Sequence, residues 1–216
     1  NTPPISVHPA DTESTVIVAN PARIVVCGVV YAANLGDGVI AECMSYVLKK
    51  HWPDTPVHHL DLSTRENYGE TAVTGKSLIL AILRNSPKFI NNAIVSVGLK
   101  VFLMRKAAPA WAEFFKLGDV LVVGGGHLLS DFNLNFPSKL ELLTRFAKIS
   151  GANLGLHAVG VSSGWSKRAI MLFDKVLARC SAASVRDEKS FANLKQQLPS
   201  VTLKPWIARD PGYLAH

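Results

Sequence analysis

Short continuous runs of apolar residues alternate along the chain with longer stretches in which apolar residues recur every three or four positions. Runs rich in Val and Ile are typical of strands buried on both faces of a parallel sheet, and the longer stretches are typical of amphipathic helices. The short runs predict strands at residues 23–30, 57–62, 119–123, 154–162, 182–186 and 201–208.

The longer stretches predict helices from the turn at Asn34-Leu-Gly-Asp37 to about Lys50, and at residues 77–84, 110–116, 138–149, 165–179 and 188–197. Residues 93–104 are ambiguous between strand and helix, and their length favours a helix. Strands that alternate with helices form right-handed βαβ units. We therefore expect an α/β fold with a Rossmann-like, doubly wound and mostly parallel sheet.

The chain has no internal repeat, low-complexity tract or interdomain linker. Residues 1–20 contain two adjacent prolines and no periodicity, which predicts an extended or disordered arm. Residues 21–216 are expected to form a single Rossmann-like domain.

With 216 residues, of which 48% are apolar, the chain can bury a large core, so disorder is excluded for the chain as a whole. Its longest stretch without charge, residues 149–166, contains four glycines, and no signal peptide is visible at the start. The sequence thus predicts no transmembrane segment. The three cysteines lie among apolar neighbours without CxxC spacing, which favours buried reduced thiols.

Lys and Arg outnumber Asp and Glu by 23 to 16, which gives a net charge of +7. A basic chain can bind anionic partners, but these charges are scattered and do not alternate with aromatic residues, so nucleic-acid binding is not predicted. The sequence shows no amphipathic basic helix of the kind that lies on a membrane.

In an open α/β sheet, ligands bind beyond the carboxyl ends of the strands, which here selects loops 33–38, 124–130, 162–166 and 186–190. In the first loop, Gly36 permits a tight turn and Asp37 falls near the first turn of a helix. Asp37 has two open interpretations, a helix N-cap or a carboxylate that binds or deprotonates a sugar hydroxyl. Asn34 similarly either fixes the turn or contacts a ligand.

In the second loop, Gly124, Gly125 and Gly126 follow a strand directly. Such a run either makes a tight turn or brings backbone N–H groups close to an anion. The run matches neither the Walker A motif nor GxGxxG, which argues against P-loop nucleotides and NAD. His127 comes next and is a candidate for proton transfer or phosphate contact, beside a purely structural role.

In the remaining loops, Arg186 either pairs with Asp187 or offers its guanidinium to a phosphate or carboxylate. Ser162 and Ser163 are ordinary loop serines or hydroxyl donors to the same ligand.

The other histidines give no sign of a metal site. His157 lies within a strand, where a core role is favoured, and the adjacent His58 and His59 point to opposite faces of a strand. No zinc or calcium spacing is present, so neither a metal nor a cofactor is predicted.

Taken together, these motifs resemble those of the polysaccharide pyruvyl transferases. The resemblance rests on five segments in order: Asn34-Leu-Gly-Asp37, Asp119 with Gly124-Gly-Gly126, Gly155-Leu-His-Ala-Val-Gly-Val-Ser-Ser163, Val185-Arg-Asp-Glu-Lys-Ser190 and Asp210-Pro-Gly-Tyr213.

The resemblance implies an enzyme of two Rossmann-like halves, similar to the GT-B glycosyltransferases, of which this chain looks like the N-terminal half. Such enzymes transfer pyruvyl from phosphoenolpyruvate to two sugar hydroxyls as a ketal, during exopolysaccharide or cell-wall polymer synthesis. The family's second half is expected to carry much of the donor site, including a histidine acid. Position 127 departs from the family, which often has a glycine or small residue where this chain has His127.

On this hypothesis the catalytic residues are Asp37, His127 and Arg186. Substrate contacts are assigned to Asn34, Gly36, Gly124, Gly125, Gly126, Ser162 and Ser163. Asp37 and Asn34 are expected to face the acceptor sugar, whereas Arg186 and the glycine amides are expected to lie towards the anionic donor.

Two other classes of function stay open: a GT-B-type glycosyltransferase half that uses a nucleotide sugar, and a non-catalytic sugar-binding α/β module. The expected partners are phosphoenolpyruvate and a carbohydrate acceptor, with a lipid-linked acceptor and a homo-oligomer as further alternatives. The expected location is cytoplasmic. If the acceptor is lipid-linked, we expect a peripheral position at the inner face of the membrane.

Overall fold

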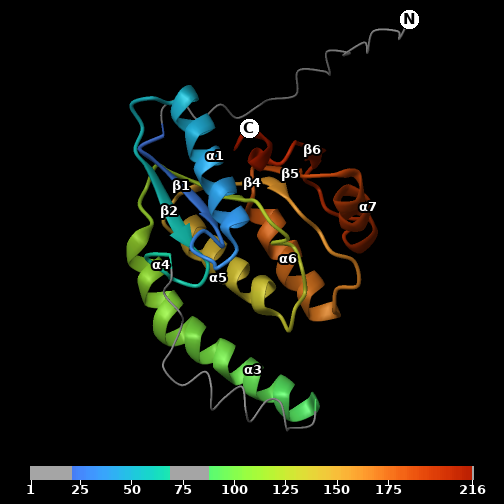
Figure 1. Cartoon of the computed structure of the whole chain (residues 1–216). Helices are drawn as coiled ribbons and strands as arrows, with labels where there is room; N and C mark the ends of the chain where they lie inside the picture. Colours follow the sequence, from blue (N-terminus) through green and yellow to red (C-terminus); the bar gives the residue numbers. More distant parts are fainter. Residues whose placement is uncertain (1–20, 69–87, 216) are drawn as a thin grey trace, which may run out of the picture.

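A computed structural model describes residues 21–68 and 88–215, which form an α/β fold around one sheet (Figure 1). The sheet has six strands in the order β2-β1-β3-β4-β5-β6, and every pair is parallel. The strands are β1 (Arg23–Gly28), β2 (Val57–Asp61), β3 (Asp119–Gly124), β4 (Asn153–Val159), β5 (Ala182–Val185) and β6 (Trp206–Ile207). The predicted parallel, Rossmann-like sheet is therefore confirmed.

The helices connect these strands along the chain. They are α1 (Leu35–His51), α3 (Lys88–Phe102), the π-helix η1 (Leu103–Ala107), α4 (Ala108–Phe114), α5 (Asn135–Ile149), α6 (Lys167–Arg179), α7 (Glu188–Gln197) and the 3₁₀ helix η2 (Pro211–Ala215). The predicted arm at residues 1–20 and the predicted helix at residues 77–84 lie outside the described residues.

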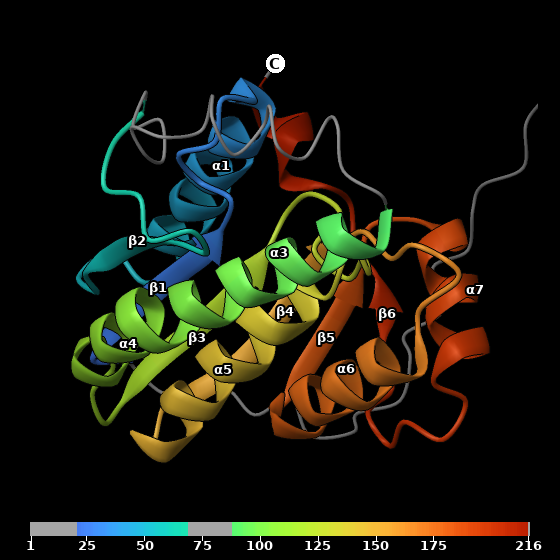
Figure 2. The same ribbon diagram turned by 90° about the horizontal axis from the view of Figure 1, so that it is seen from below.

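The direction of the connections reverses between β1 and β3. From β1 the chain passes through α1 to the edge strand β2, whereas β3, β4, β5 and β6 follow one another on the other side of β1. Right-handed crossovers then place α1 on one face of the sheet and α4, α5 and α6 on the other (Figure 2). Such a reversal opens a crevice at the carboxyl ends of the strands.

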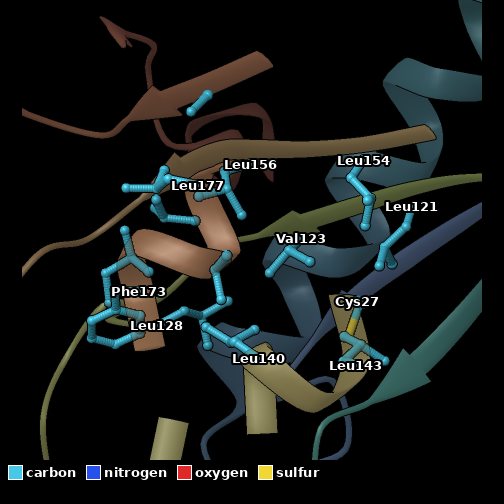
Figure 3. Close-up of a cluster of buried hydrophobic side chains, with 14 of the residues drawn as sticks. Cys27, Leu121, Val123, Leu128, Leu140, Leu143, Leu154, Leu156, Phe173 and Leu177 are labelled. Carbon is cyan, nitrogen blue, oxygen red and sulfur yellow. The ribbon is translucent and has the colours of Figure 1, made fainter. Parts of the chain in front are cut away.

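The face covered by α4, α5 and α6 holds the main core. Leu121 and Val123 of β3 and Leu154 and Leu156 of β4 point to it because alternate residues of a strand share a face. Figure 3 shows them meeting fully buried side chains of the helices, among them Phe173. An uninterrupted apolar interior of this kind fixes the positions of the strand ends.

The opposite face has a much smaller core. Its buried cluster consists of Val26 and Val30 from the β1 segment and Ala41 and Met44 from α1. On this face of the sheet, Gly155 and His157 of β4 are only partly buried. The structure thus contains one densely packed and one thinly covered sheet face.

One element prediction needs correction, and one ambiguous segment proves to be the helix that its length favoured. The last strand was expected at residues 201–208 but contains only Trp206 and Ile207, because this edge strand pairs with β5 at just two positions. The ambiguous stretch at residues 93–104 is helical, and α3 continues into η1, whose hydrogen bonds follow the wider π-helical spacing.

The cysteines and the paired histidines also have defined surroundings. Cys27, Cys43 and Cys180 are free thiols, of which Cys27 is buried and the other two are partly buried, so the expectation of burial is confirmed in full only for Cys27. His58 is exposed, whereas the ring of His59 lies 2.6 Å from the Ser45 hydroxyl, which confirms that they face opposite sides. None of the helices in the described parts of the chain has the length and apolar character needed to cross a bilayer.

Candidate active site

A cavity of about 580 Å³ lies at the carboxyl-end edge of the sheet, on the side of α1. Three segments that are distant in the sequence line it: the start of α1, the loop after β5, and the start of η2. The lining residues are Gly36, Val39, Ile40, Arg186, Asp187, Asp210, Gly212 and Tyr213. The loops predicted to converge from the ends of β1 and β5 therefore do so.

The start of α1 is fixed by Asn34. Its side-chain Oδ1 accepts a hydrogen bond from Gly36 N at 3.3 Å, and its Nδ2 donates to Asp37 Oδ2 at 3.2 Å. Asn34 is thus the N-cap, and the interpretation of Asp37 as the cap is wrong because Asp37 already lies in the first helical turn. The Asp37 carboxylate therefore does not cap the helix, and it accepts a hydrogen bond from Asn34 Nδ2 instead.

The Asp37 carboxylate lies against the chain after β3. A side-chain carbon added at Gly126 would come within 3.1 Å of Asp37 Oδ1. Burial raises the pKa of Asp37, the hydrogen bond from Asn34 opposes this, and the negative charge of Asp210 raises it further. Asp37 therefore binds a proton more readily than an exposed aspartate does.

The glycine run is required by close packing. Side-chain carbons added at Gly124 and Gly125 would come within 2.6 Å of Met44 and 2.5 Å of Ile40, both in α1. Gly125 and Gly126 also have φ angles of +78° and +57°, in the left-handed region that favours glycine. The glycines thus let α1 approach the end of β3, which brings Asp37 next to Gly126.

His127 contacts Arg186 directly. Arg186 Nη2 lies 2.5 Å from His127 Nε2. Because a guanidinium can only donate, the ring nitrogen accepts this hydrogen bond. Burial and the positive charge of Arg186 lower the pKa of His127, partly offset by Asp187. The imidazole is accordingly neutral near pH 7 and orients the arginine.

Gly160, after β4, makes room for this pair. A side-chain carbon there would come within 2.9 Å of His127 Nδ1 and 3.1 Å of Arg186 Cζ. Sequence reasoning did not select Gly160 as a site residue, although it lies within the segment 155–163 quoted for the family resemblance.

Arg186 is held from a second side by Asp187. Arg186 Nε donates to Asp187 Oδ2 at 3.1 Å, while Asp187 Oδ1 accepts from Ser190 N and caps α7. Burial alone would raise the pKa of Asp187, but the hydrogen bonds from Ser190 and Arg186 outweigh it and lower the pKa. An Asp187 that is ionised at neutral pH and a neutral His127 therefore fix the guanidinium at the cavity wall.

The segment from Asp210 to Tyr213 completes the cavity. Asp210 Oδ1 accepts from Gly212 N at 2.9 Å, which holds the turn into η2, and Tyr213 is 71% exposed at the cavity wall. Sequence reasoning quoted this segment only for the family resemblance and assigned it no role. Its position after the last short strand was the available signal, since the carboxyl end of that strand reaches the same edge.

Ser162 and Ser163 lie elsewhere. Ser162 Oγ accepts from the Trp165 indole at 3.3 Å, and Trp165 packs on Phe173 of α6. Ser163 is exposed, and neither serine is among the residues that line the 580 Å³ cavity. The structure therefore does not bring these two hydroxyls to Arg186.

A second cavity, of about 490 Å³, adjoins the first on the thinly covered sheet face. Met44, Leu48, Val122 and Trp206 give it an apolar lining, and it shares Asp210 and Tyr213 with the first cavity. His157 lies at its wall, with Nδ1 3.3 Å from the Ser184 hydroxyl. Its side chain is only partly buried, whereas the sequence favoured a core residue.

The described residues contain no group of three or more His, Cys, Asp or Glu side chains arranged to hold a metal ion. Arg186 is instead the cation in the lining of the 580 Å³ cavity that suits an anion, and the carboxylates of Asp187 and Asp210, which also line it, can accept hydrogen bonds from hydroxyl groups. Asp37 is not among the lining residues and lies against Gly126.

Comparison with known proteins identifies the family of the chain. No curated protein matches the chain. A family model described as polysaccharide pyruvyl transferase matches residues 34–205, from the Asn34 cap through Arg186 almost to β6. The match covers most of the chain, and the protein therefore belongs to the polysaccharide pyruvyl transferase family.

Proposed function

We propose that this protein takes part in pyruvyl transfer from phosphoenolpyruvate to two hydroxyls of a sugar, in the synthesis of an exopolysaccharide or cell-wall polymer. The family name describes a transferase with a carbohydrate acceptor. The observation that carries the finer proposal is the position of Arg186, fixed by Asp187 and His127 at the wall of a 580 Å³ cavity that Gly36, the neighbour of Asp37 in α1, also lines.

The charge at Arg186 suits the donor. Phosphoenolpyruvate carries a phosphate and a carboxylate, and a planar guanidinium donates paired hydrogen bonds to either. The Asp187 carboxylate accepts a hydrogen bond from Arg186 Nε, and His127 Nε2 accepts one from Arg186 Nη2. No described residue accepts a hydrogen bond from Arg186 Nη1. We infer that Nη1 binds the donor anion, with the backbone around Gly126 nearby.

The chemistry requires a proton, two hydroxyls and a leaving phosphate. Protonation of the methylene carbon of phosphoenolpyruvate leaves positive character on the neighbouring carbon, which one sugar hydroxyl attacks with loss of its proton. The second hydroxyl then attacks the same carbon, inorganic phosphate leaves with the carbon–oxygen bonding pair and takes up the proton of that hydroxyl, and the ketal closes. Fixed cations stabilise the phosphate as its negative charge grows.

Within this scheme, Asp37 is our candidate for the group that accepts the proton of an acceptor hydroxyl, with Asn34 beside it. Its raised pKa suits a base that must release its proton again. His127 is a positioning residue, since a neutral ring that accepts from Arg186 orients the guanidinium and has no proton on Nε2 to donate.

The test is pyruvyl transfer by the native enzyme and its Asp37→Ala and Arg186→Ala variants, with Arg168→Ala on the exposed start of α6 as the matched control. We expect both site variants to lose activity by at least about a hundredfold and the control to keep it. Unchanged transfer in both site variants contradicts the proposal.

A thermal-shift series separates this function from the glycosyltransferase alternative. A ligand that binds only the folded state raises the melting temperature. We expect phosphoenolpyruvate to stabilise the native enzyme and nucleotide sugars to leave it unchanged. Stabilisation by nucleotide sugars alone supports the glycosyltransferase alternative instead.

A further inference from the structure

Helix α3 and the adjoining π-helix η1 expose an apolar stripe that the proposed reaction does not use. Val97 is 60% exposed, Val101 is 49% exposed and Met104 is 75% exposed. Their spacing of four and three positions places them on one side of the helix. Because solvent-exposed apolar residues that line up in this way are uncommon on a monomer, the stripe points to a partner.

The stripe faces away from the protein core. Phe102 and Leu103 of the same segment pack against the main core, and the Lys139 ammonium lies 5.0 Å from the centre of the Phe102 ring. Figure 1 shows α3 extending from the α4 end away from the strands, and Figure 2 shows it lying outside α5. One side of the segment thus anchors it, and the other is presented outward.

The residues next to the stripe in the sequence include positively charged side chains and no carboxylate. Lys100, Arg105 and Lys106 are exposed and make no ion pair with a described residue. The sequence contains no Asp or Glu between Lys88 and Ala112. The nearest carboxylate along the chain is Glu113, in α4 beyond the stripe.

We propose that α3 and η1 dock the protein on an anionic phospholipid surface. The side chains of the stripe would enter the boundary between lipid headgroups and acyl chains. Lys100, Arg105 and Lys106 would then lie among the lipid phosphates. A protein partner fits less well, because lysine is depleted in protein interfaces and the stripe lacks the aromatic anchors that such interfaces use. This surface is independent of the pyruvyl-transfer proposal.

The sequence favoured this helix only by the length of the segment. Residues 93–104 also resemble a strand because they combine Val, Ile and Phe at both helical and alternating spacings. The outward side was recognisable only once the core contacts of Phe102 and Leu103 showed which side faces inward.

The experiment is co-sedimentation of the native protein with vesicles of phosphatidylglycerol and phosphatidylcholine, and with vesicles of phosphatidylcholine alone. We expect binding to the anionic vesicles that weakens as salt is added, and little binding to the neutral ones. Failure of the native protein to bind the anionic vesicles overturns the proposal.

Two variants and one control locate the surface. Val97→Asp with Val101→Asp removes the apolar contact, and Lys100→Glu with Arg105→Glu reverses the charge. Each pair is expected to reduce partitioning into anionic vesicles by at least about tenfold, with no change in binding of phosphoenolpyruvate. Met171→Asp on α6, at a side chain 60% exposed, is the control and is expected to bind as the native protein does.

Other occupants of the stripe give different results. If the predicted helix at residues 77–84 covers it, Val97→Asp with Val101→Asp lowers the melting temperature and leaves vesicle binding unchanged. If a second copy of the protein covers the stripe, the native protein is a dimer in sedimentation velocity and does not bind vesicles. Val97→Asp with Val101→Asp then abolishes the dimer. Either result overturns the lipid proposal without bearing on pyruvyl transfer.

Discussion

The two faces of the sheet differ in how completely they are covered. Under α4, α5 and α6 the side chains form one continuous buried cluster that includes Phe173 and Leu143. On the other face, α1 contributes only Ala41 and Met44 to the buried cluster, and a 490 Å³ cavity lies alongside. The first face holds the strands in place, and the second leaves room at their carboxyl ends for a ligand.

This contrast explains why the site lies where it does. The 580 Å³ cavity opens on the thinly covered side, and both cavities meet at Asp210 and Tyr213. A densely packed core resists local rearrangement, whereas a thinly packed region can accept a substrate at small cost in stability. We expect stability to depend on the first face and binding to depend on the second.

Matched truncations of the two cores test the contrast, and the largest effect is expected on the dense face. Phe173→Ala should lower the free energy of unfolding by about 4 kcal/mol, because the helices around it cannot collapse into the space. Met44→Ala should cost only about 2 kcal/mol, since its surroundings are already open. Urea unfolding measures both, and equal losses would remove the distinction between the faces.

Loss of the Arg186 side chain should affect binding and leave folding almost unchanged. Arg186→Ala is expected to weaken phosphoenolpyruvate binding by about a hundredfold, because the anion loses its fixed counter-charge. Arg186→Lys is expected to recover only part of that loss, since an ammonium lacks the planar fork that Asp187 and His127 hold. Isothermal titration calorimetry measures both, and native-like affinity in Arg186→Ala would exclude this residue from the donor site.

The start of the sheet, far from the cavity, should show an acid-dependent loss of stability. Burial alone would raise the pKa of Asp119, but the hydrogen bonds from Arg23 and from Lys116 N outweigh it and lower the pKa. The ionised carboxylate therefore stabilises the fold above the unfolded-state pKa near 4, and this contribution disappears as the pH falls through the folded-state pKa.

Asp119→Asn should cost about 1–2 kcal/mol at pH 7 and progressively less as the pH falls below about 4. Thermal melts of both proteins across this range measure the difference. A difference that stays constant with pH would show that the ion pair with Arg23 is not its source.

The smallest effect is expected at Asp37, and it has the opposite sign. Its folded-state pKa is raised, so the ionised form costs stability above that pKa, and the cost disappears as the pH falls below the unfolded-state pKa. Asp37→Asn should therefore stabilise the fold at pH 7 by less than about 1 kcal/mol while it lowers transfer activity. A lower melting temperature at pH 7 would show that the carboxylate is mainly structural.

The sequence predicted the parallel sheet and the convergence of the loops that contain Gly36 and Arg186, because strand ends share one edge, whatever the side-chain detail. It did not predict the contact of His127 with Arg186, which depends on the space that Gly160 leaves. It also gave Asp210 and Tyr213 no role, because the two-residue β6 that precedes them has almost no periodicity of its own. Ser162 was expected at the ligand, whereas the bond from the Trp165 indole is visible only in three dimensions.

A crystal structure of the native enzyme with phosphoenolpyruvate bound tests the central claim most directly. The account predicts that the donor occupies the 580 Å³ cavity, with its phosphate or carboxylate within hydrogen-bonding distance of Arg186 Nη1 and with the contacts of Arg186 to His127 and Asp187 intact. A donor bound in the 490 Å³ apolar cavity, or anywhere out of reach of Arg186, would contradict it.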